Sequence, residues 1–213
     1  MKPSGLSRLS SRDRRRLCLE AAAAALLAAA ACARPLPPSP DVARHAAALP
    51  SYSASLRVSV SGRELRGRSR ALVAFRRPDA LRIEIPGPSG ARLVAVTRGG
   101  RLTAVLPAER AVLESDASPE GLASLIGIAL RPEQLMDLLV GVAPGGAREY
   151  GARWGRALPQ RVDAVLGDGT KVRAIVEEAD AGEALAPAAF DPPPHGGYRP
   201  VGTDEARRLL GGR

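Results

Sequence analysis

The 213-residue chain has only two cysteines, two histidines and one tryptophan, and aromatic residues make up 3% of it. Neither His45 nor His195 has a second histidine or a cysteine at metal-ligand spacing, so we expect no bound metal. The glycine pair Gly145-Gly146 lacks the Lys-Ser/Thr of a phosphate-binding loop, and we expect no cofactor. With few aromatic side chains for base stacking, the chain is also a poor candidate for binding nucleic acid.

A recognisable set of catalytic residues is missing as well. The sequence Gly-Pro-Ser-Gly at residues 87–90 looks like the start of a nucleophile elbow, but G-x-S-x-G needs a glycine where this chain has Ala91. The acidic residues within 177–180 fit a solvated strand end better than a paired-carboxylate site. We therefore expect a protein that is not an enzyme.

The N-terminus is patterned as an export signal. Lys2 and five arginines up to Arg16 precede an Ala/Leu stretch from Ala21 to Ala31, which is shorter than the roughly 20 apolar residues that span a bilayer. Small residues then lead directly into Cys32, as at the cleavage site of a bacterial lipoprotein. We predict a lipoprotein signal peptide over residues 1–31 and lipidation of Cys32. An ordinary signal peptide with an unmodified Cys32 is the alternative.

Charge and proline content indicate that the predicted signal peptide is followed by a tether and then by a folded domain. The first 31 residues hold six basic and two acidic side chains, so the remainder keeps a net charge of +5 out of +9. The other cysteine, Cys18, is removed with the signal, which leaves no disulfide. Residues 32–41 are proline-rich and favour an extended chain. We predict a tether over 32–41 and a single domain over 42–213.

Most of that domain is patterned as β-strands. From Tyr52 to Ser61, apolar residues alternate with serine and arginine, which is typical of an antiparallel strand with one face on a core. Gly99-Gly100 and residues 167–169 are predicted hairpin turns. Similar patterns predict further strands at 70–76, 81–85, 93–97, 102–106, 111–114, 150–154, 161–166 and 171–177.

Helical spacing interrupts the strands once and returns at the C-terminus. Ser118 and Pro119 predict the start of a helix, with Ser118 as its cap and Pro119 in its first turn. A second helix is predicted to begin at Pro132 and to end at Gly141. A short final helix is predicted from residue 203 to Leu210. The predicted fold class is therefore α+β, with a curved antiparallel sheet forming an unclosed half-barrel that a helical hairpin covers. Such a shape offers an internal apolar space.

A series of short segments between residues 50 and 180 occurs in an order found in a known family. The segments are 81–85 leading into Pro88-Ser89-Gly90, the strand to Val96, Leu125-Ile126-Gly127, the apolar positions Leu135 and Leu138 up to Gly141 and Pro144, 150–154, and Leu158-Pro159. In this order they resemble LolB, the outer-membrane lipoprotein receptor. That family consists of lipoproteins, which agrees with the prediction for Cys32.

The resemblance implies a LolA/LolB-like half-barrel whose hydrophobic interior accepts the acyl chains of lipoproteins from a periplasmic LolA-like carrier. Pro88 and Ser89 match the membrane-facing loop of the family, although Ser89 stands where LolB presents a leucine, and Leu138 replaces a tryptophan. Any domain could also bury the matching cavity positions as ordinary core. By matching positions, the candidate cavity residues are Ile83, Ile85, Val94, Val96, Leu125, Leu135, Leu138 and Leu139.

Together these features predict a monomeric, lipid-anchored protein of the outer membrane whose domain faces the periplasm. It would bind acyl chains or lipoproteins and assist their localisation to the membrane. Ala33 fits this location because it is not the acidic residue that marks inner-membrane retention. One alternative is a structural or assembly factor that docks a protein partner without lipid transfer. Another is an exported enzyme, for which Ser89 and His195 are the visible candidate residues.

Overall fold

The computed structural model describes residues 37–62 and 66–211. The predicted signal peptide, Cys32 and the first part of the tether lie outside the described residues. None of the described helices combines the length and the hydropathy needed to cross a bilayer. In chain order the elements are α2 (Pro40–Ala47), β1 (Ser51–Ser61), β2 (Arg66–Arg76), β3 (Ala80–Gly87), β4 (Gly90–Arg98), β5 (Arg101–Leu106), β6 (Ala111–Asp116), α3 (Pro119–Ile126), α4 (Pro132–Leu139), β7 (Glu149–Trp154), β8 (Pro159–Val165), β9 (Lys171–Ala181), the 3-10 turn η1 (Pro187–Phe190), β10 (Arg199–Pro200) and α5 (Thr203–Gly211).

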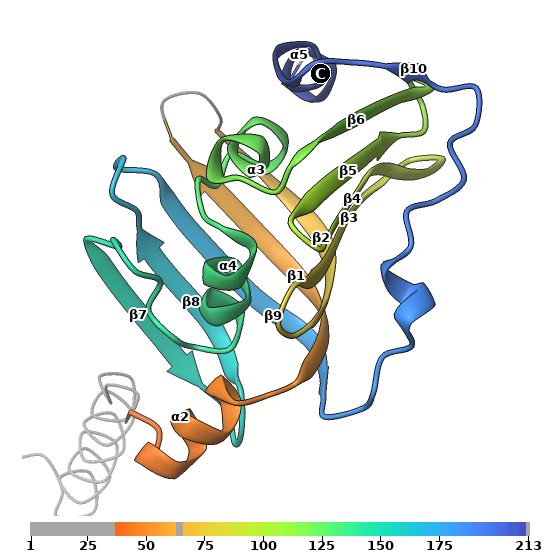
Figure 1. The fold of residues 1–213 in the computed structure, drawn as a ribbon. Helices are drawn as coiled ribbons and strands as arrows, with labels where there is room; N and C mark the ends of the chain where they lie inside the picture. The colour runs from red at the N-terminus through yellow and green to blue at the C-terminus, as the bar shows by residue number, and fades with distance from the viewer. Residues whose placement is uncertain (1–36, 63–65, 212–213) are drawn as a thin grey trace, which may run out of the picture. The chain divides into compact units, whose positions relative to one another are not determined.

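The strands form one sheet in the order β10-β6-β5-β4-β3-β2-β1-β9-β8-β7. Neighbouring strands are antiparallel except β10, which runs parallel to β6. β1 pairs with β2 on one side and with β9 on the other, so it joins the N-terminal strands to the C-terminal ones. β7 and β10 stay at opposite edges of the described sheet, which curves into an open trough (Figure 1). The predicted α+β half-barrel is confirmed.

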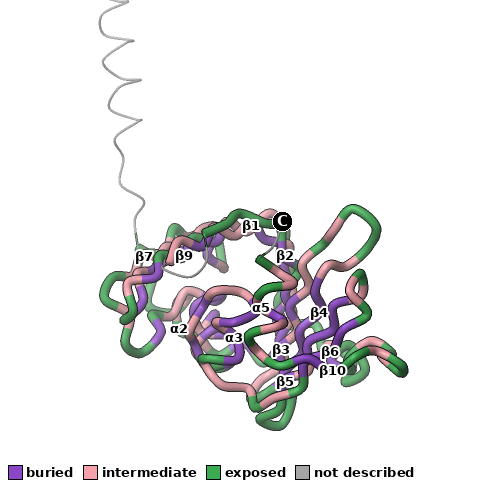
Figure 2. Tube along the Cα trace, turned by 90° about the horizontal axis from the view of Figure 1, so that it is seen from above, coloured by how far each residue is buried: buried purple, intermediate pink, exposed green. Residues whose placement is uncertain are grey.

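Two helices lie on the concave face of the sheet. Ser118 caps α3, because its hydroxyl accepts a hydrogen bond from the amide of Gly121 at 3.1 Å. At the start of α4, the Gln134 side chain accepts a hydrogen bond from the amide of Arg131 at 3.0 Å. Figure 2 shows the buried residues on the inner side of the curve, with α3 inside it. α3 also packs against α5, whose Leu210 lines the same interior, so a third helix joins the predicted hairpin.

A helix that the sequence patterns did not predict precedes β1. Ser39 accepts a hydrogen bond from the amide of Val42, Pro40 occupies the first turn and Asp41 adds a negative charge there. Residues 40 and 41, which we predicted as tether, therefore belong to α2. Its one fully buried residue is Ala46, so α2 contributes little to the core.

The chain after β9 crosses the outer face of the sheet before it returns to the other edge. Phe190 at the end of η1 is fully buried and packs with Val94 and Val96 of β4. Arg76 lies over its ring, 5.6 Å from the centroid. Arg98 makes an ion pair with Asp191 at 2.9 Å. As a result, β4 is buried on both faces, whereas most strands bury only one.

Candidate functional site: an apolar cavity inside the half-barrel

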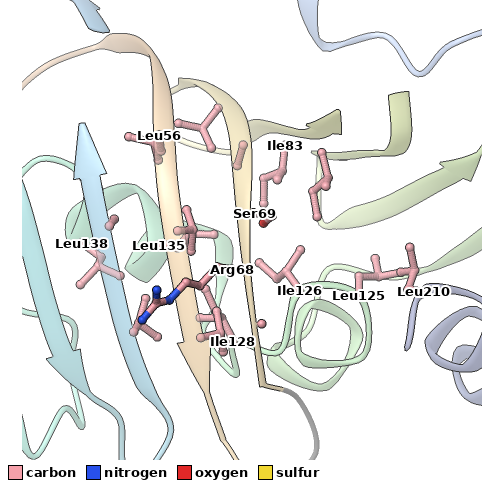
Figure 3. Close-up of a pocket in the computed structure, with 18 of the residues that line it drawn as sticks. Leu56, Arg68, Ser69, Ile83, Leu125, Ile126, Ile128, Leu135, Leu138 and Leu210 are labelled. Atoms are coloured by element: carbon pink, nitrogen blue, oxygen red, sulfur yellow. The ribbon is translucent and has the colours of Figure 1, made fainter. Parts of the chain in front are cut away.

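The cavity lies between the concave face of the sheet and the helices and has a volume of about 290 Å³. Aliphatic side chains make up most of its wall. Figure 3 shows several of them converging from β1, β2, β3, α3, α4 and α5. The lining residues are Leu56, Val58, Val60, Arg66, Gly67, Arg68, Ser69, Ala71, Val73, Ile83, Ile85, Arg92, Leu125, Ile126, Ile128, Leu135, Leu138, Leu139, Val172, Ala174, Leu210 and Gly211.

Strand register explains how the sheet supplies one wall. Leu56 of β1 faces Ala71 of β2, and Val73 of β2 faces Ile83 of β3. Directly opposed residues of antiparallel strands point to the same face of a sheet, so these side chains form a continuous apolar surface. On the other side of β1, Val60 is opposite Val172 of β9.

The helical wall is held in place by polar contacts at the far side of α4. Asp137 accepts a hydrogen bond from Arg77 at 2.7 Å, which ties α4 to the turn between β2 and β3. Gln134 donates to the carbonyl of Gly145 at 3.0 Å and so fixes the loop that follows α4. With this face anchored, Leu135 and Leu138 point toward the sheet and are almost fully buried.

The mouth of the cavity is marked by its exposed lining residues. Arg66, Arg68 and Ser69 at the start of β2 are exposed, whereas Val73 further along the strand is buried. Across the mouth, Arg92 of β4 donates a hydrogen bond to the carbonyl of Leu210, and so connects the end of α5 to the sheet. The end of α5 thus forms part of the mouth.

The predicted membrane-facing loop lies at this same end. Pro88 and Ser89 are exposed at the tip of the β3–β4 hairpin. The strands below the tip carry Ile85 and Arg92, and both of these residues line the cavity. The tip is therefore next to the mouth, although it bears no large apolar side chain.

Six of the eight predicted cavity residues line the cavity and two do not. Ile83 and Ile85 on β3 are in its wall, as are the four leucines predicted on α3 and α4, Leu125, Leu135, Leu138 and Leu139. Val94 and Val96 point to the outer face, where they pack against Phe190. The neighbouring residues Leu93 and Ala95 face inward instead. Residues 93–96 are all apolar, so this strand has no alternation from which its inner face could be chosen.

Several lining residues were not named from the sequence. Val58 and Val60 of β1 follow the alternating pattern that we read as core-facing, so that pattern could have identified them. Val172 and Ala174 of β9 belong to a similar alternation. Leu210 had no such signal, since its place at the mouth depends on the path of the tail.

Acidic side chains are absent from the described wall of the cavity. The clearest pKa shifts in buried groups belong to tyrosines that do not line it: burial raises the pKa of Tyr52 to about 12, and the same effect raises the pKa of Tyr150 to about 12. Both phenols are therefore neutral at physiological pH. The described residues also contain no cluster of three or more histidine, cysteine or acidic side chains that could hold a metal ion.

No protein-family model matches the sequence, and no curated protein matches it. Solved structures are similar over most of the chain, at low identity. An uncharacterized conserved protein from Thermus thermophilus has 14% identity and a TM-score of 0.43, over 76% of this chain and 94% of its own. A domain described as a putative outer membrane lipoprotein-sorting protein, from Vibrio parahaemolyticus, has 8% identity and a TM-score of 0.40, over 71% of this chain and 95% of its own. The lipoprotein LppX from Mycobacterium tuberculosis has 14% identity and a TM-score of 0.35, over 72% of this chain and 100% of its own.

Likeness at this level carries no conclusion about function. The resemblance to LolB in particular stays a prediction, because none of these matches singles out that family. The function has to be inferred from the cavity of this chain and from its N-terminal sequence.

Proposed function

We propose that this protein binds acyl chains, those of lipids or those that anchor lipoproteins, in the cavity between its sheet and helices. The observation that carries the proposal is a void of about 290 Å³ that aliphatic side chains line and that opens at one end. This volume is close to the lower end of the roughly 300–1,000 Å³ typical of small-molecule sites. Each methylene group that moves from water into such a space gains about 0.8 kcal/mol.

The role that follows is non-enzymatic and concerns the localisation of lipoproteins to the outer membrane. A carrier that releases acyl chains into water would expose them at the same cost of about 0.8 kcal/mol per methylene. A receptor cavity offers those chains an alternative apolar site, so a chain can pass from a LolA-like carrier to this protein without covalent chemistry. The position of Pro88 and Ser89 beside the mouth supports onward delivery at a membrane surface.

The N-terminal sequence supports a lipid anchor. Residues 21–31 run into Cys32 as a lipoprotein signal does, and the prolines that follow provide a spacer to the domain at Pro40. Two or more acyl chains on Cys32 would hold the protein firmly at a membrane, which a single chain would not. The proposed location is the outer membrane, with the domain in the periplasm.

A neutral fluorescent probe, N-phenyl-1-naphthylamine, tests the cavity directly. The sample is the chain from residue 32 onward with Cys32→Ser, which contains the whole compact unit that begins at Pro37. Ala71 is buried and lines the cavity, whereas Leu72 next to it is 45% exposed on the outer face. We expect saturable binding that Ala71→Phe reduces at least tenfold and that Leu72→Phe leaves unchanged.

Thermal unfolding of both variants must accompany the titration, since a larger side chain in a packed core typically costs about 1–3 kcal/mol. A stable Ala71→Phe variant that keeps full probe binding would contradict the cavity assignment. Absence of saturable binding to the parent chain would favour the other interpretation, a structural or assembly factor whose sheet docks a protein partner.

Intact mass measurement tests the anchor separately. Protein extracted from the membranes of a bacterial host should begin at Cys32 and carry added diacylglycerol mass, and the Cys32→Ser variant should lack that mass. Cleavage without added lipid would make the protein a soluble periplasmic one. A carrier role would then replace the receptor role.

A further inference from the structure

Basic side chains gather on the outer face of the sheet, where β2, β1 and β9 are neighbours. Leu56 of β1 and Ala71 of β2 line the cavity, so the residues that alternate with them point outward. On β9, Val172 and Ala174 line the cavity and the same alternation holds. The outward-facing basic residues of these strands, all of them exposed, are Arg57, Arg66, Arg68, Arg70, Lys171 and Arg173. We refer to these six residues as the basic surface.

Strand register places the six residues in three adjacent rows. In the row at the end of β1, Arg66 and Lys171 flank Ser61. The next row has two arginines on either side of a serine, and the third row has Arg57 beside Arg70. From the usual spacings of a sheet, the six residues arise from an area of roughly 10 Å by 13 Å. Because the serines between them are small, the cationic groups stay accessible.

Acidic neighbours are too few to neutralise the basic surface. Arg57 and Arg70 share one carboxylate, since each lies 2.9 Å from an oxygen of Glu177. Arg173 donates to Asp163 at 2.6 Å, but that carboxylate also accepts a hydrogen bond from an arginine of β8. Each of the two carboxylates therefore serves two arginines and leaves a positive charge uncompensated.

The other three members have no partner in the described part of the chain. The side chains of Arg66, Arg68 and Lys171 make neither a hydrogen bond nor an ion pair with a described residue. The start of β2 borders the cavity mouth, yet alternation along the strand directs Arg66 and Arg68 to the outer face, together with Arg70. Positive charge thus accumulates beside the mouth and outside the cavity.

The basic surface occupies only one end of the outer face. Toward the other end, the face carries Glu178 and Asp180 on β9 and Glu84 on β3. The basic end is the end at which the cavity opens, and α5 lies there as well, at the top of Figure 1. The hairpin tip at this end has Pro88 and Ser89 and no large apolar side chain. Contact between this end and another surface therefore depends on charge.

We propose that the basic surface docks the domain on an anionic membrane surface, where Arg66, Arg68 and Lys171 contact the negatively charged headgroups of phospholipids. Clusters of about four to eight basic side chains attract such surfaces, and the basic surface has six. Docking through this end keeps the cavity mouth next to the membrane. The inference goes beyond the proposed function, because it requires neither acyl-chain binding nor the lipid anchor.

The chemistry of the basic surface suits headgroups better than a protein partner. Protein interfaces usually centre on large side chains that the partner buries completely. Between the cations of the basic surface lie Ser59 and Ser61, and Ile175 in the third row is already half-buried. The exposed Leu72 lies one row further, toward the acidic end. Lipid headgroups need only charge, since they can rearrange around exposed guanidinium and ammonium groups.

Sedimentation with lipid vesicles tests the inference. The sample is the Cys32→Ser chain from residue 32 onward, so that no acyl anchor contributes. We expect vesicles of phosphatidylcholine mixed with phosphatidylglycerol to bind it about tenfold more tightly than vesicles of phosphatidylcholine alone, which corresponds to about 1.4 kcal/mol. Added salt should reduce this preference, because salt screens exposed charges. Equal binding to both kinds of vesicle would overturn the inference.

Substitution of the two unpartnered arginines locates the contact. We expect Arg66→Gln/Arg68→Gln to bind the anionic vesicles about tenfold more weakly than the parent chain. Arg66→Lys/Arg68→Lys should stay within about twofold of the parent, since a headgroup layer responds to charge and not to the planar shape of a guanidinium group. Unchanged binding by the Gln variant, or an equal loss in the Lys variant, would contradict docking by charge.

The matched control is Arg131→Gln/Arg156→Gln, which removes the same charge from exposed residues outside the basic surface. Arg131 precedes α4, and Arg156 lies in the turn between β7 and β8 at the opposite end of the sheet. We expect this control to bind anionic vesicles within about twofold of the parent. A tenfold loss in the control would mean that net charge alone governs binding, and the basic surface would lose its special role.

Two further measurements separate the inference from its alternatives. A folded Ala71→Phe variant, with its cavity filled, should bind anionic vesicles as the parent does, and a loss of binding would mean that the vesicles are bound through the cavity. Binding to soluble polyglutamate without binding to anionic vesicles would assign the basic surface to an acidic protein partner. Either result would overturn the inference. Failure of the naphthylamine probe to bind, with vesicle binding intact, would reject the proposed function alone.

Discussion

Gly141 lies directly against the indole ring of Trp154. The glycine has a φ of +88°, and a Cβ placed on it would overlap atoms of the six-membered part of the ring. Two requirements therefore coincide at this position, a left-handed backbone and the absence of a side chain. The close approach lets the end of α4 reach β7, and in this way it fixes the position of the helix that carries Leu138 and Leu139.

Replacing this glycine should destabilise the fold more than replacing a glycine of similar backbone geometry. Gly146 has a φ of +83° but no atom within 4 Å of its would-be Cβ. We expect Gly146→Ala to cost about 1–2 kcal/mol of unfolding free energy through backbone strain alone. Gly141→Ala should cost roughly 2–4 kcal/mol, since the overlap with Trp154 adds to that strain. Urea denaturation measures the unfolding free energy of both variants. Equal losses would mean that the Trp154 ring moves aside at no cost in free energy.

Truncating two buried residues of α4 to alanine should lower the unfolding free energy by different amounts, because only one of them borders the cavity. Leu138 lines it, whereas Met136 on the same helix is fully buried and does not. A truncated side chain costs most where its neighbours surround it completely. We expect Met136→Ala to lower the unfolding free energy by roughly 3–5 kcal/mol and Leu138→Ala by about 2–3 kcal/mol. Denaturant titration provides the comparison, and a larger loss at Leu138 would mean that this position is ordinary tight core.

Phe190 should contribute to the stability of the fold but not to ligand binding, because the sheet lies between its ring and the cavity. Its ring is fully buried against Val94 and Val96 on the outer face. We expect Phe190→Ala to cost roughly 3–5 kcal/mol. Binding of the naphthylamine probe, measured well below the unfolding temperature, should stay within about twofold of the parent chain. A large drop in affinity with the fold intact would show that the tail and the cavity are coupled.

Asp163 links two neighbouring strands of the outer face. The Nε atoms of Arg161 and Arg173 each donate to one of its carboxylate oxygens at 2.6 Å. Partial burial alone would raise the pKa of Asp163, but hydrogen bonds and charge from both arginines outweigh that effect and lower the pKa below its ordinary value. A carboxyl with a lowered pKa stabilises the fold above its unfolded pKa of about 3.9 and loses this contribution as the pH falls through the folded pKa.

The Asp163→Asn variant should therefore be less stable than the parent at pH 7, by roughly 1 kcal/mol at most because the side chains are largely exposed. The difference should shrink as the pH falls through the folded pKa of Asp163, because protonation of the carboxyl removes its ion pairs. Asp180→Asn is the control, since the Asp180 carboxylate is exposed on β9 and makes no ion pair with a described residue. Urea unfolding at a series of decreasing pH values checks this, and a stability difference that does not decrease with pH would rule out the ion pairs as its cause.

Local patterns predicted much of the fold correctly. Ser118 and Pro119 begin α3 as expected, and Gly99-Gly100 make the turn between β4 and β5 with positive φ values. The alternation over 81–85 correctly predicted the strand β3, and Ile83 and Ile85 of this strand line the cavity. These predictions succeed because a cap, a tight turn and a period-two strand each depend on residues that are close in sequence.

The sequence by itself thus determined nine of the ten described strands and the two inner helices, but not α2 or the short edge strand β10. Only the tertiary structure decided that Val94 and Val96 face outward, because the tail residue that covers them, Phe190, is almost one hundred positions away along the chain. It also decided that Leu210 closes part of the mouth beside Arg92. The cavity itself belongs to this second group. A residue pattern shows which side chains are apolar, but whether they meet or leave a space depends on how the sheet curves and how far the helices lie from it.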